Sequence, residues 1–282
     1  MENYTKIIIF LSFILFILDF IFPGNYTKII IFLSILILIF LILKLKDLLT
    51  PKEERFLKAA EDGDLKKIKS MLNEEINIKT LIKSVDKENN TALILASKFG
   101  YNEIVKILIE NGADVNFRNN DNSTALIEAS SFYYEVVKLL IENGADINAK
   151  DNEGTTALMM NAAMESDYYT NDEICKLLIE NGADINAKDL QGDNALIYAS
   201  IFEHFDIIKL LIESGAEINA KNNDGYTALM EASSDGNLET VKLLIENGAD
   251  VNIKNNDGKT ALDLADFEDE DMKEVLRKAI AK

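Results

Sequence analysis

Histidine and cysteine, which commonly serve in catalysis and metal binding, are almost absent from this 282-residue chain. The sequence contains one histidine, His204, and one cysteine, Cys175. A lone cysteine can form neither a disulfide framework nor a cysteine-based metal cluster. The absence of a disulfide framework is compatible with a reducing cytoplasm but does not establish one.

Two stretches imitate functional loops. Gly258-Lys259-Thr260 resembles the end of a phosphate-binding loop, but that loop needs a glycine five residues before Gly258, where Ile253 stands. The segments before Gly225 and Gly258 are rich in Asn and Asp, as calcium loops are, but their first ligand position holds Ala220 or Ile253. The sequence therefore predicts no catalytic residue, no metal site and no cofactor.

The sequence instead indicates a binding surface, which is built from a repeated unit. Leu140–Asp146 and its copies join the end of an apolar helical pattern to a glycine. The glycines are spaced by 32, 38, 33 and 33 residues, and such a period is typical of a solenoid, whose units bury their apolar faces by stacking. They are Gly112, Gly144, Gly182, Gly215 and Gly248.

Each unit carries local signals for two helices and a turn. Glu135–Ile141 has apolar residues at helical spacing, and Gly144 supplies the left-handed residue that ends a helix. A polar segment then closes at Asn or Gly, which tolerate a positive φ, and the N-cap of the next helix follows two residues later. The closing residues are Asn89, Asn122, Gly154, Gly192, Gly225 and Gly258. The caps are Thr91, Thr124, Thr156, Asn194, Thr227 and Thr260.

This unit resembles the ankyrin repeat. The family's opening Thr-Pro-Leu-His-x-Ala is matched by Thr91–Ala96 and its copies, with Ala in place of Pro and Ile, Met or Asp in place of His. The resemblance implies an all-α solenoid of helix pairs joined by β-turn fingers. We expect this domain at residues 50–282, with about seven repeats of which the first and last are atypical caps. Cys175 and His204 then fall at structural positions, in a helix core and an inter-helix turn.

Two repeats depart from the regular length. The repeat that begins near Asn122 lacks one residue at Phe132–Tyr134, and the next carries an insertion at Met164–Asp172. Insertions in solenoids lie on one face, often the binding face.

The resemblance also implies that a partner meets the finger tips and the ends of the inner helices. The tips carry one acidic residue in most units, and the helix ends carry aromatic or apolar residues where polar ones would serve. The candidate partner-binding residues are Phe99, Phe132, Tyr133, Glu153, Tyr168, Tyr169, Ile201, Phe202 and Asp224. The alternative, that the aromatic residues only fill the groove between repeats, stays open.

The charge of the chain restricts the partner. With 48 acidic and 29 basic residues the net charge is −19 at pH 7, which repels nucleic-acid phosphates and anionic lipid. We expect the partner to be another protein, basic in charge, and expect neither nucleic acid nor a small-molecule substrate. Solubility alone is the simpler explanation of the charge.

Residues 1–49 have a different composition, in which Asn3–Ser12 recurs as Asn25–Ser34. About 20 apolar residues cross the hydrocarbon core of a bilayer, so residues 4–22 and 26–45 are predicted to form a transmembrane hairpin. Alternatives are one span with the other copy in the membrane interface, and a cleaved signal peptide.

Basic residues follow the second apolar run, and this bias predicts that the repeats face the cytoplasm. They are Lys44, Lys46, Lys52 and Arg55. The sequence therefore indicates a membrane-anchored ankyrin-repeat protein that mediates protein–protein interaction as a non-catalytic scaffold or adaptor. The alternative is a docking or regulatory subunit of a membrane complex, such as a channel or transporter.

Overall fold

The structure is a computed structural model that describes residues 34–36, 39, 50–74, 78–164, 171–265 and 269–281. The chain divides into two units, Met1–Arg55 and Phe56–Lys282, and the second contains the repeats. The predicted membrane spans, 4–22 and 26–45, lie almost wholly outside the described residues. In the part that is described, no helix is both long and apolar enough to cross a bilayer.

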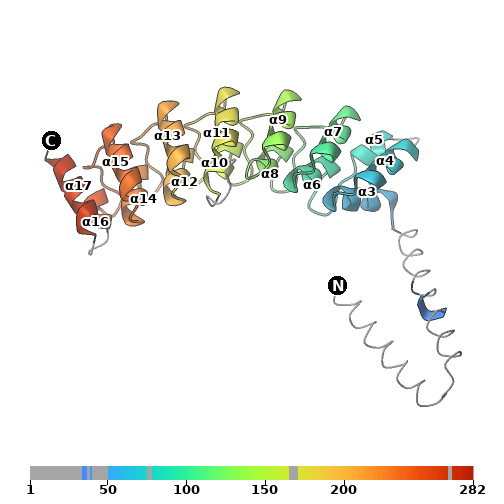
Figure 1. Ribbon diagram of the computed structural model, residues 1–282, viewed down its shortest axis with the longest axis horizontal. Helices are drawn as coiled ribbons and strands as arrows, with labels where there is room; N and C mark the ends of the chain where they lie inside the picture. Colours follow the sequence, from blue (N-terminus) through green and yellow to red (C-terminus); the bar gives the residue numbers. More distant parts are fainter. Residues whose placement is uncertain are drawn as a thin grey trace, which may run out of the picture. The chain divides into compact units, whose positions relative to one another are not determined.

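The second unit is an all-helical solenoid, as predicted (Figure 1). From α6 onward the first helix of each pair packs on the first helix of the next pair, and the second helices, from α4 onward, pack on one another in a row. The pairs are α3 (Lys52–Glu61) and α4 (Leu65–Glu74), α6 (Ala92–Lys98) and α7 (Asn102–Glu110), α8 (Ala125–Ala129) and α9 (Tyr134–Glu142), α10 (Ala157–Ala162) and α11 (Asn171–Glu180), α12 (Ala195–Ile201) and α13 (Phe205–Glu213), α14 (Ala228–Ser234) and α15 (Leu238–Glu246), and α16 (Ala261–Leu264) and α17 (Glu270–Ile280). The short α5 (Ile78–Ile82) follows α4.

The helix boundaries are set by the residue types that the sequence repeats. The Thr124 side chain accepts a hydrogen bond from the backbone N–H of Ile127 at 3.4 Å, and Asn194 caps α12 in the same way at 3.0 Å. Gly144, after α9, has φ +83°, where an L side chain would be strained. Asn122 closes its finger at φ +60°, so both predicted types of left-handed residue are confirmed.

The core lies between the two rows of helices. Leu108, Leu140 and Leu178, on the second helices, are fully buried. On the first helices the small side chains of Ala96 and Ala129 are equally buried, and their size lets neighbouring first helices approach closely. Burying each leucine is worth about 1.5–3 kcal/mol, and that burial depends on the next repeat being in place.

Hydrogen bonds between successive fingers hold the array in register. The Asn148 side chain spans one joint, because its Nδ2 donates to the Gly182 carbonyl at 3.1 Å and its Oδ1 accepts from the Asp184 N–H at 2.8 Å. Asn116 and Asn219 repeat both bonds at other joints.

The basic side chains of the fingers serve the same purpose. Lys150 Nζ donates to the Lys188 carbonyl at 2.6 Å, and Lys188 Nζ donates to the Lys221 carbonyl at 2.6 Å. Arg118 begins this series at the Lys150 carbonyl, and Lys221 continues it to the Lys254 carbonyl. These cations therefore bond backbone oxygens one repeat ahead.

Candidate protein-binding surface

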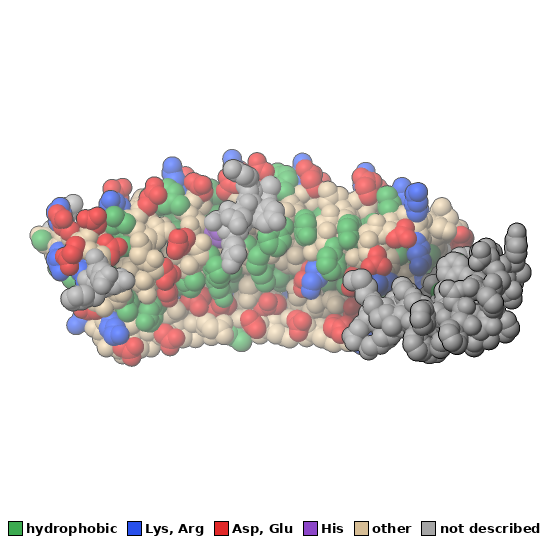
Figure 2. Space-filling model, turned by 60° about the horizontal axis from the view of Figure 1, so that its bottom comes forward, with side chains coloured by type: hydrophobic (Ala, Val, Ile, Leu, Met, Phe, Trp, Pro, Cys, Tyr) green, Lys and Arg blue, Asp and Glu red, His purple; other side chains and the backbone are tan. Residues whose placement is uncertain are grey.

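The fingers are the polar segments between each second helix and the next first helix. Together with the first helices they form one face of the solenoid, here called the finger face. Figure 2 shows hydrophobic side chains in a band along the array, with Asp and Glu side chains beside it. Three of the acidic tips, Asp121, Glu153 and Asp224, are exposed in their fingers. Glu153 and Asp224 are thus placed as the sequence predicts, on the solvent side of fingers whose positions the inter-finger hydrogen bonds fix.

The candidate aromatic and apolar residues divide into two groups. Phe99, Phe132 and Phe202 are 40%, 40% and 37% exposed, which is high for side chains of this size. Tyr133 and Ile201 are half-buried and pack against the core. The Tyr133 ring covers Gly100 so closely that a Cβ there would clash with it. Tyr133 therefore fills space between repeats, whereas the three phenylalanines leave apolar surface in solvent.

The insertion cannot be placed in this surface. Tyr168 and Tyr169, the two candidates within it, lie outside the described residues, which end at Met164 and resume at Asn171.

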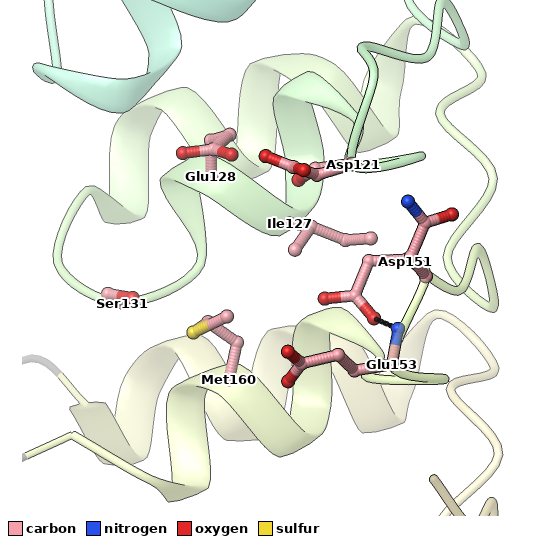
Figure 3. A pocket seen from close by; sticks show the side chains of 9 residues that line it. Asp121, Ile127, Glu128, Ser131, Asp151, Glu153 and Met160 are labelled. Carbon is pink, nitrogen blue, oxygen red and sulfur yellow. Dashed lines mark hydrogen bonds between the residues drawn. The ribbon is translucent and has the colours of Figure 1, made fainter. Parts of the chain in front are cut away.

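A pocket opens on the finger face between α8 and α10 (Figure 3). Carboxylates of two fingers border it, and Ile127 and Met160 supply its apolar wall. Glu128 on α8 adds a further carboxylate from the helix side. Sequence reasoning missed Glu128 and Met160, although both lie four residues after an N-cap, a position that recurs in every unit.

The same position on later helices carries further polar groups. Burial, with the charges of Asp193 and Asp235, raises the pKa of Glu231 on α14 to about 7. Burial also raises the pKa of Asp193, although a hydrogen bond from Asn222 opposes this. Tyr198 on α12 donates its hydroxyl proton to Asp189 at 2.7 Å. Burial thus disfavours the ionisation of Glu231 and Asp193, and neighbouring carboxylates add to the effect, so a cation bound beside these two groups would favour their charged forms.

The two residues best suited to catalysis are buried in the structure. Cys175 is fully buried, and burial raises the pKa of its thiol to about 12, so it is a packed core side chain as predicted. His204 is 5% exposed at the start of α13, and burial lowers the pKa of its imidazole. Among the described residues, no three His, Cys, Asp or Glu side chains are grouped as metal ligands would be.

Comparison with known proteins decides the family. A family model of ankyrin repeats matches residues 56–151 and 133–222, and a second matches residues 211–265. The chain belongs to the ankyrin-repeat family. Ankyrin repeats form protein-interaction modules, so the repeats of this chain are a module of that kind.

Relatives of known identity share only part of this ankyrin-repeat protein. It is 38% identical to the E3 ubiquitin-protein ligase XBAT32 of Arabidopsis thaliana over 73 residues, which are 26% of this chain and 14% of that protein. XBAT33 of the same plant is 44% identical over a segment of equal length and coverage. The chain thus spans about 14% of the length of these relatives. The crystal structure of the human ASB11 ankyrin repeat domain superposes with a TM-score of 0.69 at 25% identity, covering 79% of this chain and 96% of that one.

Proposed function

We propose that this ankyrin-repeat protein is a non-catalytic adaptor that binds a basic segment of another protein on its finger face. The proposal rests on a difference between the basic and the acidic side chains of the fingers. Four finger cations bond carbonyl oxygens of the next finger, namely Arg118, Lys150, Lys188 and Lys221. Acidic tips such as Glu153 and Asp224 point into solvent instead. The fingers therefore present a negative edge to an approaching partner, and such an edge accelerates association with a basic protein.

The exposed phenylalanines supply the second half of the interface. Phe99 and Phe202 are the C-cap residues of first helices, and Phe132 follows the C-terminal end of α8. A partner that covers them removes apolar surface from water, and well-packed aromatic residues often contribute more than 2 kcal/mol each to binding. The acidic tips would then govern the association rate constant of the partner, and the phenylalanines its dissociation rate constant.

The proposed adaptor is anchored to a membrane by residues 4–45, with its repeats on the cytoplasmic side. Support for this part comes from the sequence alone: two apolar runs of spanning length, followed by a basic flank. The second candidate function, a docking or regulatory subunit of a channel or transporter, rests on the same anchor. Blue-native electrophoresis of membranes separates the two, because a subunit migrates in one stable large complex and an adaptor does not.

Ubiquitin ligation is not part of the proposal. That activity is named for relatives which match this chain over only 73 residues. The shared segment is too small a part of them to transfer a whole-protein activity.

A partner is first identified by cross-linking and mass spectrometry. Variants of the full chain with individual acidic residues neutralised then test the proposal in mild detergent. One triple variant neutralises the acidic tips Asp121, Glu153 and Asp224. A matched triple neutralises exposed glutamates that end second helices and are not at finger tips. These controls are Glu110, Glu142 and Glu246.

Surface plasmon resonance at two ionic strengths then compares the variants. The finger triple should slow association several-fold at low salt and much less at 0.15 M, where exposed charges are screened beyond about 8 Å. The control triple should leave the rate near that of the parent chain. Equal effects of the two triples would show that net charge, and not the finger face, governs binding.

A further inference from the structure

The pocket between α8 and α10 carries a more specific inference, which rests on the function proposed above. It lies between the two repeats of irregular length. The first helices there have five and six residues, compared with seven in α6, α12 and α14. The pocket has a volume of about 310 Å³ and opens to solvent, so an extended side chain can enter it.

The carboxylates around the pocket are mostly available to a ligand. Among the described residues, no hydrogen bond or ion pair engages the carboxylates of Asp121 and Glu153. Glu128 forms an ion pair with the exposed ammonium of Lys98 at 3.6 Å, and no other partner is found for it among the described residues. One oxygen of Asp151 accepts two finger N–H groups at 2.8 and 2.9 Å, and its other oxygen is not used by these bonds. Figure 3 shows these groups around one opening.

A buried hydroxyl points to a ligand independently of the charges. Ser123 lines the same pocket and is 4% exposed. Its Oγ has no hydrogen-bond partner among the described residues. A buried polar atom without a partner costs free energy, so a ligand that brings a donor to this oxygen would regain it.

The next repeat has a hydrogen-bond donor that this pocket lacks. Asp151 and Asp189 are equivalent, since each lies three residues before the glycine that closes its finger. Tyr198 of α12 donates its hydroxyl to Asp189 at 2.7 Å. The equivalent of Tyr198 in α10 is Met160, which has no proton to donate. At α12 the chain supplies its own side-chain donor to the finger acid, whereas at α10 no side chain of the described residues donates to the second oxygen of Asp151.

The shape of the site favours an organic cation. Within the described residues the acidic groups do not converge as ligands of a metal ion would. They are spread around an opening with an apolar wall of Ile127 and Met160. A guanidinium group suits this arrangement, because it is planar, offers five N–H donors and is weakly hydrated, while its aliphatic stem packs on apolar side chains.

We propose that this pocket receives one arginine side chain of the partner protein. Its guanidinium group lies among the carboxylates of Asp121, Glu128 and Glu153. Its stem lies against Met160, and one N–H group donates to Ser123 Oγ.

The probe for this proposal is a capped pentapeptide, Gly-Gly-Arg-Gly-Gly, titrated into the full chain in mild detergent and followed by NMR of labelled methionine methyl groups. Saturable shifts of the Met160 methyl signal are expected. Two matched peptides carry lysine or citrulline in place of arginine. Citrulline keeps the shape without the charge, so it should bind at least roughly tenfold more weakly, and lysine should fall between the two.

Variants locate the binding. Glu128→Gln and Glu153→Gln should each weaken the arginine peptide by roughly 3- to 10-fold, the range for a partly exposed charge-assisted bond. Met160→Tyr introduces the donor found in α12 and should weaken peptide binding as well, measured by calorimetric titration because this variant lacks the Met160 methyl signal. Glu231→Gln, on a helix that does not border the pocket, is the matched control and should change nothing.

Three results would overturn the proposal: absence of saturable shifts, equal affinity for the arginine and citrulline peptides, or equal effects of Glu128→Gln and Glu231→Gln. Failure here is separable from failure of the proposed function. If only the pocket assignment is wrong, partner binding still depends on Asp224 and on salt. If the proposed function is wrong, partner binding ignores the finger acids altogether.

Discussion

Asn148 offers the sharpest test of how the fingers are held in position. Its side chain makes two bonds to the next finger, at 3.1 Å to the Gly182 carbonyl and at 2.8 Å to the Asp184 N–H. One hydrogen bond contributes a net of about 0.5–1.5 kcal/mol. Because Asn148 is exposed and water can replace part of the loss, Asn148→Ala should lower the free energy of unfolding by about 1–2 kcal/mol.

Urea unfolding of the full chain in mild detergent, followed by circular dichroism at 222 nm, measures this change. Asn252→Ala is the matched control, because Asn252 has the same place in its finger but bonds no following finger in the described chain. Its effect should stay within about 0.5 kcal/mol. Hydrogen exchange should locate the loss, with faster exchange at the Gly182–Asp184 joint in the Asn148 variant only.

Two outcomes would refute this reasoning. Equal destabilisation by Asn148→Ala and Asn252→Ala would show that the asparagine acts within its own finger. Faster exchange spread over all repeats, without a maximum at the joint, would show that the inter-finger bonds do not hold the register.

Three further predictions concern single residues. Gly225→Ala should lower the urea midpoint more than Gly215→Ala: both glycines have positive φ, but a Cβ at Gly225 would lie 2.9 Å from the Asn256 backbone nitrogen and one at Gly215 would meet nothing within 4 Å. Cys175, with a thiol pKa of about 12, should resist a thiol reagent at pH 8 in the folded chain and react fully in urea. The folded-state pKa of Glu231, about 7, lies above its ordinary 4.5, so its ionisation makes stability fall as pH rises from about 4.5 to about 7. Glu231→Gln should therefore raise the urea midpoint at pH 8 and leave it nearly unchanged at pH 4.5.

The helix boundaries were predictable because each depends on residues next to one another in the chain. Thr124 caps α8 through a bond to Ile127, three residues later, and Gly144 ends a helix through its own φ. The order of the elements followed from the repeat period. The burial of Cys175 followed in the same way, since equivalent positions in other repeats hold Val or Ile.

The pocket could not be predicted in this way, because it depends on pairs of residues in different repeats. Glu128 and Met160 are unremarkable one at a time, and they border one opening only because α8 and α10 are neighbours in the array. The hydroxyl of Ser123 is unpaired for reasons of packing that the sequence does not contain. A sequence signal did exist in the two irregular repeat lengths, which flank the pocket.

The acidic character of the finger face and the rigidity of the fingers have a common origin. Each finger lysine that bonds a carbonyl oxygen of the next repeat, as Lys150 and Lys188 do, is held away from the acidic tips. A lysine released to pair with Glu153 would neutralise the tip but leave that carbonyl oxygen to water and loosen the joint. A basic partner brings its own donors, so it can neutralise the carboxylates without taking any from the inter-finger bonds. Binding and fold stability therefore do not compete for the same cations, and a partner that engages several tips at once stabilises the solenoid by mass action, more strongly the further its free concentration exceeds its Kd.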